Sequence, residues 1–182
     1  MRSVVVLSAV LILTACASAS EAPVDVAPAP SATAPAPAAR PVPVLSASFE
    51  HASAACNEWA TSSGATAIRS VPPRTGDYAC KLCGGADGAM TLARRTAPLA
   101  AGRYVLSAYV RRRAGLPGPG AAQVVLGDAA SALVDLKDDG YALASVAVDV
   151  PTDGAVLDVK IAAIASASEC FLVDDVLVAR EP

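Results

Sequence analysis

The sequence is poor in aromatic residues and has almost no histidine. Its 182 residues include one Trp, two Phe and four Tyr, and His51 is the single histidine. A Ser-His-Asp hydrolase would have to use His51, yet no GxSxG nucleophile elbow accompanies it. A phosphate-binding loop, an HExxH zinc motif and a recognisable pair of catalytic carboxylates are missing as well. The sequence therefore predicts that the protein is not an enzyme.

The chain also has little net charge and no hydrophobic run of transmembrane length. The net charge is −3 at pH 7, which argues against nucleic acid and against a strongly charged partner. The apolar run at residues 4–13 is far shorter than the ~20 residues that a transmembrane helix needs. Because Arg2 precedes this run and small residues follow it, the pattern is typical of an export signal.

The signal ends with Leu13-Thr14-Ala15-Cys16, which is similar to the lipobox of bacterial lipoproteins. The resemblance implies that residues 1–15 are a signal peptide and that Cys16 receives lipid. Two or more acyl chains give stable membrane attachment, so we expect a lipid-anchored protein of the cell envelope. Ala17, in the place where an Asp would retain the protein, favours the outer membrane, at its periplasmic face or at the cell surface. The alternative is an ordinary signal peptide with a chance cysteine.

Proline and alanine dominate residues 16–44. Proline removes backbone donors and favours the extended polyproline conformation, so this segment cannot pack a core. We interpret residues 16–44 as a disordered tether that begins with the lipidated Cys16. Residues 45–182 are enough to bury one core and form a single domain.

That domain shows alternating apolar and polar positions rather than helical spacing, which predicts an all-β fold. About nine or ten short strands separated by turn residues are typical of a jelly-roll β-sandwich. Residues 103–112 show the alternation most clearly, with Tyr104 on the core face and with Tyr109 and Arg111 on the opposite face. Asp153-Gly154 suits a hairpin turn between two long strands. The predicted strands are 45–50, 66–70, 78–83, 89–95, 103–112, 122–126, 132–136, 141–150, 155–164 and 170–178.

Four cysteines remain after Cys16, and an even set in an exported domain predicts two disulfides. Cys80 and Cys83 could instead form a redox or zinc motif, but a helix after the first cysteine or a second CxxC knuckle would then be needed. Residues three apart in a strand point to opposite faces. Cys80 and Cys83 are therefore expected to bridge outward, to Cys56 and Cys170 in either order.

Four short stretches occur in the order and spacing of a known group. This pattern resembles the galactose-binding-like jelly roll shared by carbohydrate-binding modules of families four and nine, which implies glycan binding by a non-catalytic domain. The stretches are Ser48-Phe49-Glu50, Thr75-Gly76-Asp77-Tyr78-Ala79, residues 101–110 and Phe171-Leu172-Val173-Asp174-Asp175-Val176.

The resemblance also implies a structural calcium where the first and last strands meet. Glu50, Asp174 and Asp175 would supply some of its six to eight oxygen ligands. Independently of any family, acids inside an apolar strand are costly to bury unless they are paired or hydrogen bonded. The alternative is that one acid faces solvent while the other caps a loop through hydrogen bonds.

A sugar site needs aromatic platforms, and few rings are free to serve. Phe49, Tyr104 and Phe171 belong to the core by pattern. The alternatives to a sugar-binding role are that Trp59 covers the end of the sandwich and that the polar positions form a solvated outer face. The candidate ligand-binding residues are Trp59, Tyr109, Arg111, Tyr141, Asp158 and Lys160.

The basic residues are concentrated in two short runs, residues 94–95 and 111–113. Such runs are usually solvated, but they could also meet anionic polysaccharide or lipid headgroups. Taken together, the patterns predict a membrane-tethered glycan-binding lipoprotein. The alternative, which the shortage of aromatic residues favours, is a structural or accessory envelope lipoprotein that contacts a protein partner and binds no sugar.

Overall fold

The computed structural model describes residues 40–50, 56, 58–61, 66–70, 72–84, 89–113, 120–137, 140–164 and 170–182. The predicted signal peptide, Cys16 and most of the predicted tether lie outside these ranges. Among the described residues, no helix has the length and apolar character needed to cross a membrane.

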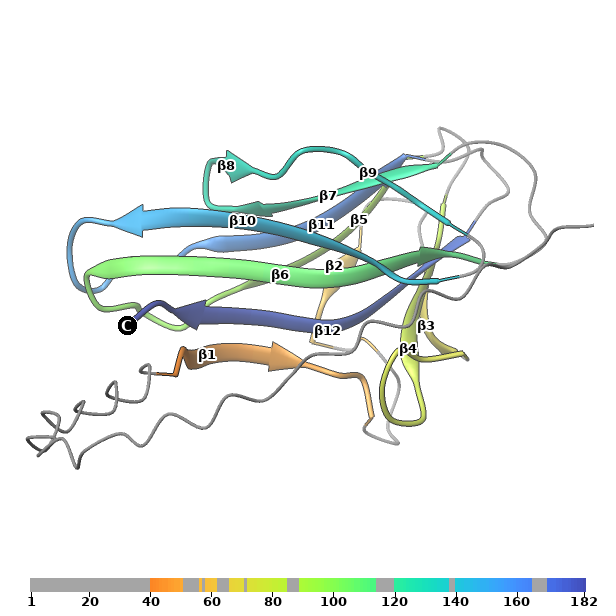
Figure 1. Cartoon of the computed structure of the whole chain (residues 1–182), viewed down its shortest axis with the longest axis horizontal. Helices are drawn as coiled ribbons and strands as arrows, with labels where there is room; N and C mark the ends of the chain where they lie inside the picture. The colour runs from red at the N-terminus through yellow and green to blue at the C-terminus, as the bar shows by residue number, and fades with distance from the viewer. Residues whose placement is uncertain are drawn as a thin grey trace, which may run out of the picture. The chain divides into compact units, whose positions relative to one another are not determined.

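Antiparallel strands build the described part of the chain (Figure 1). Twelve strands occur within the described residues: β1 (Val42–Ala47), β2 (Ala60–Thr61), β3 (Thr66–Ser70), β4 (Ala79–Cys83), β5 (Ala89–Arg95), β6 (Gly102–Arg112), β7 (Ala121–Leu126), β8 (Ala129–Ala130), β9 (Val134–Asp135), β10 (Ala142–Val150), β11 (Asp158–Ile164) and β12 (Cys170–Arg180).

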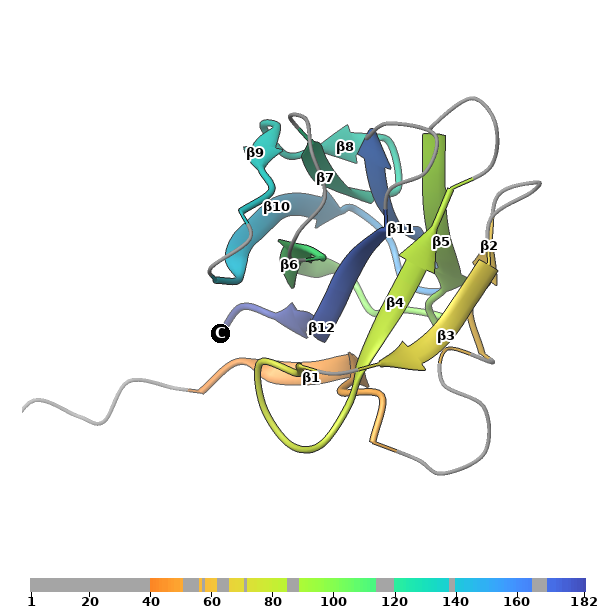
Figure 2. The same cartoon turned by 90° about the vertical axis from the view of Figure 1, so that its right-hand side faces the viewer.

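The strands form two sheets that pack face to face, as Figure 2 shows from the end. Sheet A has the order β10-β6-β12-β4-β3, and sheet B has the order β2-β5-β11-β7-β8 with β9 also on β7. One edge of β12 is shared, because β4 pairs with its first half and β1 with its second half. The architecture confirms the predicted all-β sandwich.

The core lies between the sheets and follows the expected alternation. In β6 every second residue is buried, from Tyr104 to Val110, while Tyr109 and Arg111 point to the other face. Phe49 and Phe171 are buried as predicted. The largest fully buried side chains are Tyr104, Phe171, Leu82, Met90, Leu92, Leu106, Leu126, Ile161, Leu172, Val110 and Val124.

Two strand predictions need correction. The first strand covers Val42–Ala47 rather than 45–50, because Phe49 adopts a left-handed φ of 59° that ends the extended run. Asp153-Gly154 does not form a hairpin, since β10 belongs to sheet A and β11 to sheet B. Gly154 donates its N–H to Leu99 O, and Asp153 accepts the N–H of Ala101, so the chain turns toward residues 99–101 and crosses between sheets.

A β-bulge in β12 accounts for the two adjacent acids in an apolar strand. The register of β12 on β6 takes one extra residue between Asp174 and Leu177, and Asp175 has a left-handed φ of 46°. One extra residue shifts the alternation by one position, so neither acid has to point between the sheets. The core residues are Phe171 and Val173 before the bulge and Val176 and Val178 after it.

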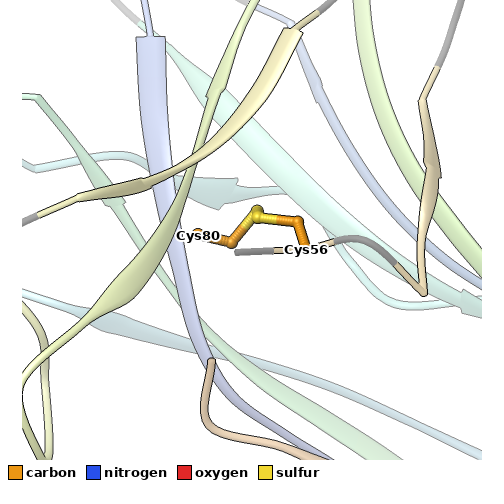
Figure 3. The surroundings of a disulfide bond; sticks show 2 residues. All are labelled: Cys56 and Cys80. Atoms are coloured by element: carbon orange, nitrogen blue, oxygen red, sulfur yellow. A yellow bond between two sulfur atoms is a disulfide. The ribbon is translucent and has the colours of Figure 1, made fainter. Parts of the chain in front are cut away.

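Two disulfides fasten β4 to distant segments. Cys56 bonds to Cys80 (Figure 3) at a sequence separation of 24, and Cys83 bonds to Cys170 at a separation of 87. Cys83 and Cys170 are direct partners in the β4–β12 ladder. Cys80 is buried in the core while Cys83 is on the opposite face of β4. The prediction that both cysteines bridge outward is confirmed.

Candidate functional site

The bulge acids hold a loop, residues 72–78, against sheet A. Asp174 is fully buried, and its Oδ2 accepts the N–H of Arg74 at 2.7 Å and that of Thr75 at 3.2 Å. Its Oδ1 accepts the N–H of Asp175 at 2.8 Å. Three backbone donors thus satisfy a carboxylate that would otherwise be costly to bury.

Asp175 and Glu50 hold the same loop through other atoms. Asp175 accepts Arg74 Nη1 at 2.6 Å and the Thr75 hydroxyl at 2.7 Å. Glu50 accepts the N–H of Asp77 at 2.8 Å and that of Tyr78 at 3.3 Å. Gly76 sits between these anchors. Its left-handed φ of 63°, and the collision that a Cβ would make with the Glu50 carboxylate, both require glycine there.

These contacts bear on the predicted calcium. Among the described residues, no group of three His, Cys, Asp or Glu is placed to hold a metal ion. The oxygens of Glu50, Asp174 and Asp175 face N–H donors, a hydroxyl and a guanidinium. These donors carry positive partial or full charge where a cation would sit, so this arrangement does not fit a three-carboxylate calcium site. Calcium binding by these acids stays an untested prediction.

The loop also contacts the predicted sugar-binding tyrosines. Arg74 Cζ lies 3.4 Å from the centroid of the Tyr109 ring, a cation–π contact. The Tyr141 hydroxyl donates to Pro72 O at 2.8 Å, and Arg111 Cζ lies 5.9 Å from the centroid of the Tyr141 ring. Arg74, Tyr109, Arg111 and Tyr141 therefore gather in one group, which we call the tyrosine cluster. One ring face of Tyr109 is already covered by Arg74.

Burial and nearby charges shift three titratable groups here. Burial raises the pKa of Tyr141, and Asp174 raises it further while Arg111 lowers it, so the phenol stays protonated and can donate to Pro72. Burial raises the pKa of Asp174, although the backbone hydrogen bonds from Arg74, Asp175 and Thr75 act in the other direction. The hydrogen bond to Asp175 raises the pKa of Arg74.

Trp59 does not join the cluster, contrary to the expectation that it could be a platform. Its side chain is 7% exposed and belongs to the core, where its ring centroid lies 6.3 Å from that of Phe49. The N–H of Trp59 donates to Cys56 O at 2.9 Å, and Cys56 is tied to the core residue Cys80. This turn holds the indole inward, which is the alternative role considered for it.

Asp158 and Lys160 also lie elsewhere, because they belong to β11 in sheet B. Asp158 pairs with Arg95 at 3.2 Å and with Lys160 at 3.7 Å. Alternation alone could not reveal which sheet this strand joins. Both residues border a shallow depression of about 350 Å³ whose lining residues are Glu58, Ala60, Ala93, Arg94, Arg95, Asp158 and Lys160.

Sequence reasoning overlooked Arg74 and Lys81. Arg74 lies in the loop before Gly76, where no periodicity indicates direction. Lys81 is half-buried on β4 between two core residues, Cys80 and Leu82, so the alternation of that strand could have placed it on the outer face of sheet A.

Comparison with known proteins defines the class of fold. No protein-family model matches the chain, and no curated protein matches it. Among solved structures, the similar ones include carbohydrate-binding modules with this type of β-sandwich. The domain therefore has the jelly-roll fold of carbohydrate-binding modules, as predicted. Families four and nine in particular stay a prediction.

Three of these structures illustrate the likeness. The first family 22 module of Paenibacillus barcinonensis Xyn10C, a xylan-binding domain, is 14% identical with a TM-score of 0.63, covering 79% of this chain and 99% of its own. Another family 22 xylan-binding domain is 14% identical with a TM-score of 0.56, over 76% and 95%. TmCBM61, solved with β-1,4-galactotriose, is 14% identical with a TM-score of 0.52, over 69% and 90%.

Proposed function

We propose that this protein is a non-catalytic glycan-binding module tethered to a membrane of the cell envelope. The observation that carries the proposal is the tyrosine cluster, which places two aromatic rings and two guanidinium groups together on a carbohydrate-binding-module fold. The solved structures with this fold include modules described as binding xylan and one in complex with galactotriose. These likenesses support the proposal.

Within the cluster, Tyr141 serves as the platform on which a sugar ring stacks. Tyr109 is less suited to that role, because one of its faces carries Arg74 at 3.4 Å. Arg111, beside the Tyr141 ring, offers N–H donors to sugar oxygens. The hydrogen bond from Tyr141 to Pro72 fixes the ring in place, which lowers the entropy lost when a ligand binds.

The tether follows from the sequence. Lipid on Cys16 anchors the chain, and the Pro/Ala-rich residues before β1 hold the domain away from the bilayer; the predicted tether, 16–44, is shortened because residues 42–44 belong to β1. Outer-membrane placement rests on Ala17 after the lipidated cysteine. The missing catalytic motifs, and the engagement of Glu50, Asp174 and Asp175 in loop contacts, support a binding role rather than a catalytic one.

Affinity electrophoresis through a panel of polysaccharides tests the proposal. We expect the native protein to be retarded by at least one of them. Tyr141→Ala should weaken that binding by about tenfold or more, because a buried tyrosine contact is worth this much in an interface. Tyr141→Phe is the matched control. It keeps the ring, removes only the hydroxyl bond to Pro72, and should bind within about threefold of the native protein.

Two results would count against the proposal. Lack of retardation by every polysaccharide, with the native fold shown by circular dichroism, would favour the accessory role with a protein partner. Retardation that Tyr141→Ala leaves unchanged would remove the tyrosine cluster from the site. If Tyr141→Ala fails to fold, Arg111→Gln replaces it, because that change alters a neighbouring side chain without removing the ring.

A further inference from the structure

A row of side chains crosses sheet A beside Tyr141. In the strand ladders, Leu172 of β12 lies directly opposite Arg111 of β6 on one side and opposite Lys81 of β4 on the other. Residues in register on adjacent strands share a face. Lys81, Leu172 and Arg111 therefore line up, and the Arg111 guanidinium approaches the Tyr141 ring. We call these four residues the Lys81 row.

The middle of the row is apolar. Leu172 is 1% exposed, yet it is not part of the core between the sheets, so it is covered by neighbours on the outer face. Strands in a sheet lie about 4.8 Å apart, which separates the backbones of Lys81 and Arg111 by about 10 Å. The row thus places two cations on either side of a buried apolar residue, with an aromatic ring at one end.

The charges on this face are unevenly matched. The described acids closest to the row are Asp174 and Asp175, and both are engaged by loop 72–78, Asp174 through three backbone donors and Asp175 through Arg74 and Thr75. Lys81 makes no ion pair with a described residue. β3, the strand beside β4, has the sequence TAIRS and contains no acid. Within the described part of the chain, the end of the row at Lys81 therefore carries positive charge without a carboxylate partner.

We propose that the glycan bound by this protein is acidic, with carboxylate or sulfate groups seated between Lys81 and Arg111. This inference rests on the proposed glycan-binding function and specifies its ligand class. A sugar ring stacks at Tyr141, and the anionic substituent completes charge-assisted hydrogen bonds with the two cations. A neutral glycan would partly desolvate Lys81 without supplying a counter-charge, which costs free energy.

The test compares acidic polysaccharides with their own neutral forms. The full-length protein, kept oxidised, is run by affinity electrophoresis through polygalacturonate, alginate and chondroitin sulfate, and through carboxyl-reduced or desulfated preparations of each. We expect retardation by at least one acidic form, at least about tenfold weaker binding to its neutral form, and weakening at high salt. Polyglutamate, a polyanion without sugar rings, should not compete.

Variants assign the effect to the row. Lys81→Gln should weaken binding of the acidic glycan by about tenfold, the loss of one charged hydrogen bond, and should leave binding of the neutral form unchanged or slightly stronger, because the desolvation cost of Lys81 is removed. Lys160→Gln is the matched control, since Lys160 is also half-exposed on a strand but lies in sheet B. It lowers the net charge equally and should change binding less than twofold.

The outcomes separate the two proposals. Equal binding of acidic and neutral forms would overturn the acidic ligand class and leave glycan binding in place. Binding that only neutral polysaccharides show would do the same. Competition by polyglutamate, or an equal loss in Lys160→Gln, would reduce the effect to general charge and overturn the assignment to the row. Absence of binding to every acidic and neutral polysaccharide would overturn both proposals together.

Discussion

Asp174 is the residue on which the loop beside the tyrosine cluster depends. Its carboxylate is fully buried, and it lies on the face of β12 opposite the core residue Val173, where it accepts the N–H groups of Arg74 and Thr75. A charged hydrogen bond of this kind is worth more than a neutral one. Because Arg74 in turn stacks on Tyr109, the acid positions a side chain of the candidate site without belonging to it.

Asp174→Asn is expected to lower the free energy of unfolding by about 1–3 kcal/mol, since the amide can replace only part of the acceptor set and leaves a buried N–H unpaired. The loss should also depend on pH. Burial raises the pKa of Asp174 in the folded state above its ordinary value of 3.8. The folded protein then binds more protons than the unfolded chain, so this residue's contribution is complete below pH 3.8 and is lost as pH rises through the folded pKa.

Urea unfolding of the native protein and of Asp174→Asn at a series of acidic pH values measures the two free energies of unfolding. The gap between the two unfolding free energies should narrow as pH rises. Asp153→Asn is the control. Asp153 is exposed, and its carboxylate accepts one backbone N–H, from Ala101, whereas that of Asp174 accepts three. That variant should lose less stability. A gap that widens with pH would mean that the hydrogen bonds, rather than burial, dominate the titration of Asp174.

At the scale of elements, β4 carries one cysteine of each of the two disulfides. Its inward cysteine, Cys80, holds the turn that contains Trp59, and its outward cysteine, Cys83, is bonded to Cys170 at the start of β12. Alternation within the strand is the reason that the two cysteines serve different faces. The second disulfide also borders the Lys81 row, because Cys170 and Leu172 occupy the same face of β12.

Replacing both members of this disulfide, as Cys83→Ala with Cys170→Ala, is expected to lower the free energy of unfolding by about 2–4 kcal/mol. The covalent loop spans 87 residues, and closing a long loop restricts the unfolded chain strongly. Chemical denaturation measures the loss, and non-reducing peptide mapping should show that Cys56 and Cys80 remain bonded. Unchanged stability, or a new pairing of Cys56 or Cys80, would contradict the assigned role.

The elements that sequence predicts well are those whose alternation is strong. β6 was expected from its alternation of apolar and polar residues, and the faces of Tyr104 and Tyr109 followed from it. Failures occurred where tertiary contacts override local signals. Asp153-Gly154 has hairpin chemistry, but its hydrogen bonds go to residues 99–101 and carry the chain to the other sheet.

The candidate site was predictable in part for the same reason. Tyr109, Arg111 and Tyr141 were expected together and the structure gathers them. Asp158 alternates in the same way, yet sheet membership depends on long-range pairing that no local pattern encodes. Arg74 was not predicted because its position comes from Asp174 and Asp175, which are about 100 residues further along the chain.

At the scale of the whole molecule, the candidate face lies far from the point where the tether joins the domain. Val42, at the start of β1, pairs with Arg180 at the end of β12. Leu172 lies eight residues earlier in that strand, a distance of about 26 Å at 3.3 Å per residue. The strand that follows the tether therefore begins at the end of sheet A away from the Lys81 row. A ligand bound at the Lys81 row therefore does not touch the point where the tether joins the domain.

This arrangement makes membrane attachment and ligand binding separable. Cys16→Ser is expected to release the protein from the membrane fraction into the soluble fraction of the exporting cell, because the proposed acyl chains on Cys16 would supply the attachment. Fractionation and immunoblotting measure the change, with a high-salt wash to remove protein held by charge alone. Lys81→Gln is the control and should stay with the membrane.

If Cys16→Ser stayed with the membrane after the wash, attachment would have to come from another part of the chain. If it were released but no longer bound polysaccharide that the native protein binds, the tether would be part of the binding site, and the independence inferred from the geometry of β1 and β12 would be wrong.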